Sequence, residues 1–301
     1  MAPSRELAQA SLEVATGVNI VIDEQNIDVG ELPVRYLVAG EGPPLVLLHA
    51  LGESALDWRW VLPDLARTHR VYAPDLPGFG YSAKPSTEYS PAFFARFVGA
   101  YLDALGLERT ALVGNSLGGL IALRLALSEP ARVSALSLVS SAGLGRAVTY
   151  ALRLLTLPGY GEAAVAWAKT PLGAAQRAGL RVPLLFARPK RVPDEWITEQ
   201  RRLAQLAGFT EATISALRAH VDMGGQREVL ADQLPHLAMS TLIIWGKRDR
   251  VFPYSQAQKA LSRLRQGFLE LIPDCGHLPQ LEQPDRFAAI LGQFLDGQAS
   301  R

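Results

Sequence analysis

The stretch that decides the fold is Leu112-Val113-Gly114-Asn115-Ser116-Leu117-Gly118-Gly119. It continues the apolar run 110–113, which is short enough and branched enough to predict a buried strand. It leads into residues 120–128, where apolar residues recur at helical spacing. The chain must therefore turn from a strand into a helix within a few residues around Ser116.

Gly114 and Gly118 give this turn the G-x-S-x-G pattern of a nucleophile elbow. Such an elbow holds the serine in a sparsely populated backbone conformation, and side chains two residues away would collide with neighbouring backbone. The turn would expose the Ser116 hydroxyl at the start of a helix, where N–H groups favour developing negative charge. Glycine and serine are common in loops, so a tight turn with a solvated serine is the alternative until partners are found.

Length, net charge and cysteine content limit the classes of protein to which this chain can belong. The chain has 301 residues, of which 49% are hydrophobic, and a formal net charge of +1, which suits one large α/β domain with an inserted subdomain. Near-neutral charge argues against nucleic acid as a partner. The single cysteine, Cys275, excludes an internal disulfide framework and favours a cytoplasmic location. No apolar run approaches ~18 residues and no leader pattern is visible, so we expect neither a membrane span nor secretion.

Strands and helices alternate along most of the chain. Apolar runs predict an antiparallel pair at 18–22 and 32–39, and further strands at 45–48, 70–73, 110–113, 135–139, 241–245 and 268–271. Helices are predicted at 91–106, 120–128, 255–264 and 284–294, with another that contains Trp58 and Leu65. The alternation predicts an α/β fold with a mostly parallel sheet of about eight strands and helices on both faces.

Residues 143–233 interrupt this alternation. They contain helix-like stretches rich in alanine, leucine and arginine, broken by several prolines, and no convincing strand. We therefore expect a core formed by residues 1–142 and 234–301, with a helical insertion between its two parts. Residues 1–16 are expected to form a frayed or helical tail.

An activated serine needs a base within hydrogen-bond reach and an acid that orients the base. Functional loops of an open α/β sheet lie at the carboxyl ends of strands, and both His49 and His277 follow a predicted strand. Only His277 comes after every candidate acid, so we assign it as the base, whereas His49 is placed to brace a loop. The other histidines are His69, His220 and His236, at helix ends or on helical stretches.

Asp249 is the carboxylate that best fits the role of the acid, because it directly follows the predicted strand 241–245. Asp274 is too near His277 in the sequence to reach its ring easily, and we expect it in a turn. Asp75 also follows a strand, but in a loop rich in proline and glycine, where an Asx turn is expected.

The order nucleophile, acid, base, with a strand before each member, resembles that of the α/β-hydrolase fold superfamily. The resemblance covers about residues 18–294. It rests on five motifs in the family's order: His-x-x-Gly at 49–52, Asp-x-Pro-Gly-Phe-Gly-x-Ser at 75–82, the elbow, Gly-x-x-Asp at 246–249 and Gly-His at 276–277. It implies that the insertion at 143–233 is a cap that covers the active site and shapes the substrate pocket.

The resemblance also implies an oxyanion hole made by the backbone N–H groups of Leu117 and Leu51. Two preset donors there would each contribute on the order of 3 kcal/mol to the transition state. Where the family usually has glycine after the histidine, this chain has Ala50. If that position requires a positive φ, the alanine costs on the order of 1 kcal/mol and reshapes the loop.

A serine nucleophile favours acyl transfer. Haloalkane dehalogenases and epoxide hydrolases use aspartate at the elbow because their alkyl-enzyme ester is released by attack on the carboxylate, and a serine alkyl ether would not hydrolyse. We therefore expect a carboxylesterase for small to medium, mostly apolar esters. Apolar residues of the insertion either line its pocket or form the cap's own core: Leu154, Leu155, Val165, Trp167, Leu184, Leu185 and Phe186. The candidate substrate-binding residues are His49, Trp167, Phe186 and Leu278.

The alternative is a carbon–carbon bond hydrolase of the meta-cleavage type, whose elbows resemble this one. Such enzymes typically carry a glycine-rich oxyanion loop, a tryptophan after the catalytic histidine and a cap arginine for a dienoate carboxylate. Here Leu278 follows the histidine and the loop is not glycine-rich, although Arg181, Arg188 or Arg191 could supply the cap arginine. The same triad also permits cofactor-free perhydrolase activity, and a non-catalytic ligand-binding member of the fold is the alternative from another class.

We expect a small-molecule ester as the partner, no cofactor, no metal site, and a monomer or homodimer. The histidines His49, His220 and His236 have no carboxylate or histidine at ligand spacing, and Cys275 stands alone.

Overall fold

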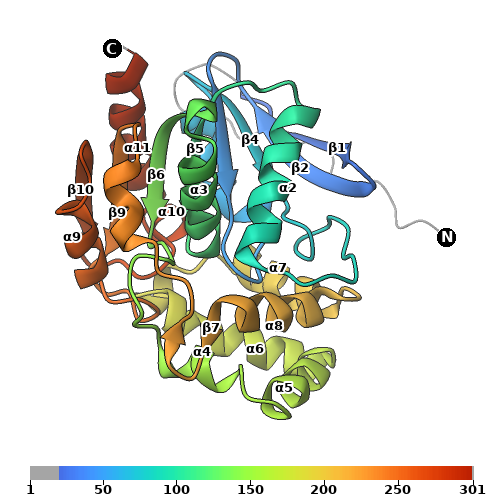
Figure 1. Cartoon of the computed structure of the whole chain (residues 1–301). Helices are drawn as coiled ribbons and strands as arrows, with labels where there is room; N and C mark the ends of the chain where they lie inside the picture. Colours follow the sequence, from blue (N-terminus) through green and yellow to red (C-terminus); the bar gives the residue numbers. More distant parts are fainter. Residues whose placement is uncertain (1–19, 300–301) are drawn as a thin grey trace.

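An eight-stranded sheet forms the centre of the computed structural model, which describes residues 20–299 (Figure 1). The strands lie in the order β1-β2-β4-β3-β5-β6-β9-β10. β2 is antiparallel to both of its neighbours, and all other neighbours are parallel. The bounds are β1 Asp23–Val29, β2 Leu32–Ala39, β3 Pro44–Leu48, β4 Arg70–Pro74, β5 Thr110–Asn115, β6 Val133–Val139, β9 Thr241–Gly246 and β10 Gly267–Ile272. The predicted α/β fold with a mostly parallel sheet is confirmed.

Helices cover both faces of this sheet. Those outside the insertion are η1 Ala55–Trp58, α1 Leu62–Leu65, α2 Pro91–Ala104, α3 Leu117–Ser128, η2 Pro130–Arg132, η4 Ala231–His236, α9 Ser255–Leu261, α10 Pro279–Glu282 and α11 Pro284–Ala299. Within the described residues no helix is long and apolar enough to cross a bilayer.

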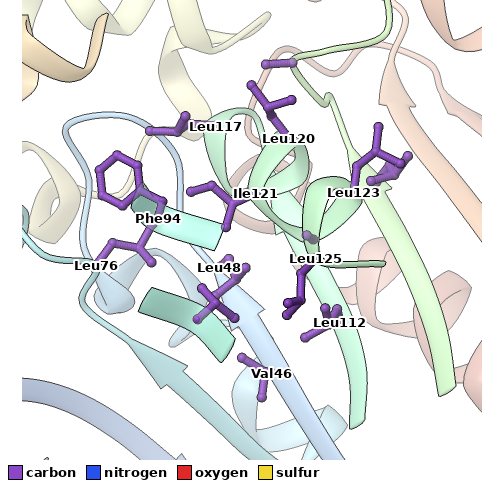
Figure 2. Packing of buried hydrophobic residues seen from close by; sticks show 14 of the residues in the cluster. Val46, Leu48, Leu76, Phe94, Leu112, Leu117, Leu120, Ile121, Leu123 and Leu125 are labelled. Atoms are coloured by element: carbon purple, nitrogen blue, oxygen red, sulfur yellow. The ribbon is translucent and has the colours of Figure 1, made fainter. Parts of the chain in front are cut away.

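Successive side chains of β3 enter two different cores because they point to opposite faces of the sheet. Val46 and Leu48 pack with α2 and α3, and Figure 2 shows them beside Leu112 of β5 and the leucines of α3. Leu45 and Leu47 pack on the other face with residues of α1 and α11. All four β3 side chains are fully buried, and each such burial stabilises the fold by about 1.5–3 kcal/mol.

The insertion between β6 and β9 packs across one end of the sheet, below it in Figure 1. Its helices are α4 Tyr150–Leu154, α5 Tyr160–Ala168, α6 Pro171–Leu185, η3 Pro189–Arg191, α7 Asp194–Gln205 and α8 Phe209–His220. The prediction that this block contains no strand is wrong at one point, because β7 Val221–Asp222 and β8 Gly225–Gln226 form a short hairpin. The rest of the block is helical, as expected, but Pro183 does not break a helix, because α6 continues through it to Leu185.

The first strand differs from the prediction. The apolar run at 18–22 was expected to pair with 32–39, but the partner of β2 is β1, with Asp23 opposite Val38. β1 is an edge strand with mostly exposed, polar side chains, so apolar patterning does not reveal it. The hairpin turns at Gly30, where φ is +60°. The tail predicted at 1–16 lies outside the described residues.

Asp75 does not form the Asx turn expected from its loop. Its buried side chain is instead a hub, by which we mean that it binds three separate segments of the chain. It is fully buried, and its Oδ1 accepts the N–H of Ala55 (2.6 Å) while its Oδ2 accepts the N–H of Tyr81 (2.8 Å). Oδ2 also accepts from the guanidinium of Arg35 on β2 at 3.2 Å. These contacts attach the loop after β4 to β2 and to η1.

We expect Asp75→Ala to destabilise the fold by about 3–5 kcal/mol, because it leaves two backbone N–H groups without their acceptor and the buried Arg35 with only the half-exposed Glu24 as its partner. Urea unfolding at pH 7 measures the change. The matched control is Glu24→Gln, which removes the other, half-exposed carboxylate that pairs with Arg35 and should change stability by less than about 1 kcal/mol. Equal losses in the two variants would contradict the role of Asp75 as a hub.

Candidate active site

Ser116 lies at the turn between β5 and α3 with φ 55° and ψ −114°, a conformation that residues with side chains rarely adopt. Two close backbone approaches explain the flanking glycines. A Cβ on Gly114 would lie 2.2 Å from the carbonyl oxygen of Gly118, and a Cβ on Gly118 would lie 2.3 Å from that of Leu48. The Ser116 N–H donates to the carbonyl oxygen of Val139 on β6 at 2.9 Å. The structure therefore contains the strained elbow that the glycines predict.

Asp249 and His277 are brought together by the loops that follow β9 and β10. The His277 Nδ1 lies 2.8 Å from the Asp249 Oδ2. The other carboxylate oxygen accepts the N–H groups of Val251 (2.7 Å) and Phe252 (3.1 Å), which hold the carboxylate in place. In the tautomer whose Nδ1 donates to the carboxylate, Nε2 carries the lone pair that can act as a base. His277 and Ser116 line the same cavity.

His49 braces the loop that follows β3. Its Nε2 accepts the N–H of Leu76 at 2.9 Å, so the proton is on Nδ1, which donates to the carbonyl oxygen of Ala50 at 2.8 Å. Burial lowers the pKa of His49, which keeps the ring neutral. The carbonyl that accepts this bond belongs to the same peptide as the Leu51 N–H, so the bond polarises the expected oxyanion donor as well as orienting it.

The two expected oxyanion donors are in positions to serve a ligand. Leu117 is the first residue of α3, and among residues 20–299 neither its N–H nor that of Leu51 donates to the protein. Ala50 carries no backbone penalty, because Ser116, Ser140 and Asp274 are the only described non-glycine residues with positive φ. The positive φ of the loop falls instead on Gly52, at +67°.

Ser116 and His277 open into a cavity of about 610 Å³ beneath the insertion. Its apolar walls come mainly from α4, α5, α6 and α8, and include Leu152, Leu154, Leu155, Val165, Leu180, Leu184, Ile214 and Leu217. Two of the candidate substrate-binding residues, Trp167 and Leu278, line this cavity. The other two do not. His49 is fully buried and bonds to the backbone of Ala50 and Leu76, and Phe186 packs edge-on against Trp196 with ring centroids 5.1 Å apart.

One end of the cavity is polar, where α6 meets the loop after β3. Glu53, which is fully buried, forms an ion pair with Arg181 and accepts from the Gln200 Nε2 at 2.6 Å. Among the three arginines considered from the sequence, only Arg181 lines the cavity, and this pair neutralises it. Arg188 instead pairs with Asp274 outside the cavity.

Arg177, one helical turn before Arg181 on α6, also lines the cavity and was not singled out in the sequence. Its guanidinium reaches the Gln200 Oε1 (3.3 Å) and the Gly52 carbonyl oxygen (3.5 Å) and lies over the ring of Phe209. Within the part of the chain that the structure describes, it forms no ion pair. Desolvation, and next the neighbouring Arg181, lower the pKa of Arg177 to about 9, so it is a partly buried cation at pH 7.

Asn115 is a second residue whose role the sequence does not reveal. Its Nδ2 donates to the carbonyl oxygens of Val139 (3.0 Å) and His277 (3.1 Å), and its Oδ1 accepts from the Gln280 Nε2 (3.3 Å). The side chain beside Ser116 therefore connects the elbow to the histidine loop. Only its position next to the serine hinted at this.

Residues 20–299 contain no group of three or more His, Cys, Asp or Glu side chains that could hold a metal ion. The thiol of Cys275 is fully buried, and burial is the largest of the effects that raise its pKa above the usual range of a cysteine.

Comparison with known proteins identifies the family. Residues 43–284 match the family model described as the α/β-hydrolase fold, so the chain belongs to that family.

Its relatives carry the names of several hydrolases. The chain is 34% identical over 266 residues to the 2-hydroxymuconate semialdehyde hydrolase of Pseudomonas sp. (strain CF600), a match that covers 85% of this chain and 88% of the relative. A solved membrane phospholipase A superposes with a TM-score of 0.78 at 27% identity, over 93% of this chain and 87% of that chain. The 2-hydroxy-6-oxo-6-phenylhexa-2,4-dienoate hydrolase from Rhodococcus sp. strain RHA1 superposes with a TM-score of 0.79 at 25% identity, over 92% of this chain and 100% of that chain.

We expect His49→Gln to slow the reaction of Ser116 with a fluorophosphonate probe by about 10-fold. Loss of one oxyanion donor slows serine hydrolysis by about 100- to 1000-fold, and a displaced Leu51 N–H should retain part of its effect. Labelling rates at pH 7.5 measure the change. His236→Gln, at an exposed histidine of η4, is the matched control and should react as fast as the wild type. Equal rates for both variants would show that His49 does not support the oxyanion loop.

Proposed function

We propose that this chain is a serine hydrolase that cleaves carboxylic esters of small to medium, mostly apolar substrates. The observation that carries the proposal is the contact of 2.8 Å between Asp249 and His277, in a mostly apolar cavity that the histidine shares with the strained Ser116. A nucleophile, a base and an orienting acid in this arrangement suit acyl transfer.

The reaction would run in two halves. The Ser116 Oγ attacks the ester carbonyl while the His277 Nε2 takes its proton, and Asp249 stabilises the resulting imidazolium. The oxyanion of the tetrahedral intermediate accepts the N–H groups of Leu117 and Leu51. Collapse expels the alcohol, which receives the proton from His277. Water, deprotonated by the same nitrogen, then attacks the acyl-enzyme and releases the carboxylic acid, which restores the serine.

The shape and lining of the cavity support the choice of substrate. About 610 Å³ is within the range of pockets that enclose a small organic ligand, and leucines of α4 and α6 offer apolar surface for an acyl or alcohol chain. Trp167, which lines the cavity while 47% exposed, donates from its indole Nε1 to the Gln176 Oε1 at 2.6 Å. Trp167 would therefore meet a chain that extends toward solvent.

We expect the wild type to hydrolyse nitrophenyl esters, with kcat/KM rising from acetate to medium chains as more CH₂ groups are buried at about 0.8 kcal/mol each. Ser116→Ala should lose at least about 1000-fold in kcat, since it removes the nucleophile. Release of nitrophenolate measures both. Ser262→Ala, at an exposed serine after α9, is the matched control. Wild-type rates equal to those of Ser116→Ala on every ester would contradict the proposal.

A second candidate is carbon–carbon bond hydrolysis of the meta-cleavage type. The partly buried cation of Arg177 favours it, because Arg177 forms no ion pair within the described residues and a substrate carboxylate would supply one. The similarity to the Pseudomonas and Rhodococcus hydrolases points the same way. Against it stand Leu278 after the histidine and Ala50 in the loop, where that type typically carries tryptophan and glycine. These departures keep ester cleavage as the first proposal.

We expect Arg177→Gln to separate the two candidates. If an anionic substrate binds there, the variant raises KM for a dienoate vinylogous diketone by about 10- to 100-fold, the value of one charged hydrogen bond, and leaves neutral esters within about 2-fold. Loss of the visible absorbance of the dienoate measures turnover. Arg109→Gln, at an exposed arginine, is the matched control. No turnover of the dienoate by the wild type would remove the second candidate.

A further inference from the structure

Glu282, at the end of α10, is a buried carboxylate that bonds to backbone from two parts of the chain. It is 4% exposed. Its Oε2 accepts the N–H groups of Gly276 (2.7 Å) and Ala187 (3.1 Å), and its Oε1 accepts the N–H of Arg188 (2.8 Å). Within the described residues it forms no ion pair with a lysine, arginine or histidine. Its charge is therefore met by three backbone donors, one from the histidine loop and two from the insertion.

The two segments that Glu282 joins also contact each other directly. The His277 N–H donates to the carbonyl oxygen of Leu185 at 2.7 Å. A Cβ on Gly276 would lie 2.3 Å from that same oxygen and 2.8 Å from the Ala187 nitrogen. Only a glycine permits this approach. We call this contact of residues 185–188 with residues 276–277 the histidine seam.

The seam is one of three connections that determine where His277 lies. Its N–H is held by Leu185 of the insertion, and its carbonyl oxygen accepts from Asn115 of the elbow at 3.1 Å. Its ring is held by Asp249 after β9. The imidazole is thus positioned relative to Ser116 by three separate elements. The insertion is one of them, although it contributes no member of the triad.

The chemistry of the seam explains why a charged side chain is buried there. All three partners of Glu282 are donors, and they approach both of its oxygens, so only a side chain that accepts at both ends satisfies them. A glutamine of the same size would present its NH₂ group to at least one N–H. Hydrogen bonds to a carboxylate are stronger than those to a neutral acceptor, which offsets the cost of taking the side chain out of water.

We propose that Glu282 is a positioning residue for His277. It clamps residues 185–188 to the histidine loop, so that the end of α6 moves with the catalytic histidine rather than with the rest of the insertion. The inference rests on the proposed function, in which His277 activates Ser116.

The test compares Glu282→Gln and Gly276→Ala with the wild type. The first removes the acceptor for one donor, and the second forces the two backbones apart from the other side. We expect each to lower kcat for the preferred ester and the rate of fluorophosphonate labelling of Ser116 by about 10-fold, because displacements near 1 Å cost up to about 100-fold. KM should stay within about 2-fold, since the apolar walls are unchanged. Glu270→Gln, at an exposed glutamate of β10, is the matched control and should change neither rate.

Thermal unfolding, measured in parallel, separates positioning from stability. Variants that lose only melting temperature, with labelling and kcat at wild-type values, would overturn the inference and leave Glu282 a structural residue. If Glu282→Gln does not fold, Gly276→Ala decides alone by the same rates. A wild type that the probe does not label would overturn the proposed function and this inference together. A labelled wild type with equally reactive variants would overturn the inference alone.

Discussion

The contact between α3 and β3 is the constraint on which the site depends. α3 can begin against the end of β3 only because Gly118 has no side chain to meet the carbonyl oxygen of Leu48. The expected oxyanion donors lie on either side of this contact, with Leu117 one residue before Gly118 and Leu51 three residues after Leu48. A side chain at Gly118 would push the helix away from the strand and separate the two N–H groups. The conformation of Ser116 and the spacing of these two N–H groups therefore depend on the same contact.

The insertion is joined to both loops that shape the site, each time through a buried glutamate. Glu53 pairs with Arg181 and binds Gln200, which attaches the loop after β3 to α6 and α7. Glu282 attaches the histidine loop to the segment after α6. Breaking a buried charged contact leaves an uncompensated charge, which costs several kcal/mol. Both contacts therefore resist separation of the insertion from these two loops.

The sequence predicts best where one local rule decides the structure. Strands such as β3 and β5 are buried on both faces, so continuous apolar runs reveal them, and the loops that follow strands reveal Ser116, Asp249 and His277. The edge strand β1 was not predicted, because its polar, exposed side chains form no apolar pattern. Contacts between residues that are far apart in the sequence were not predicted either. The link from Asp75 to Arg35 and the place of Arg177 in the cavity depend on how separate elements pack. His49 and Phe186 were expected in the pocket, and packing places them behind it.

The place of the insertion between β6 and β9 affects how the chain can fold. β6 pairs with β9 through contacts such as Leu136 opposite Thr241, so residues 140–240 form a loop that must close before the sheet is complete. Loop-closure entropy rises only with the logarithm of length, so the equilibrium stability suffers little. Parallel pairing between strands far apart in the sequence is slow, however. During synthesis β6 cannot pair with β9 until the whole insertion has left the ribosome. Meanwhile the growing sheet has an open apolar edge at β6.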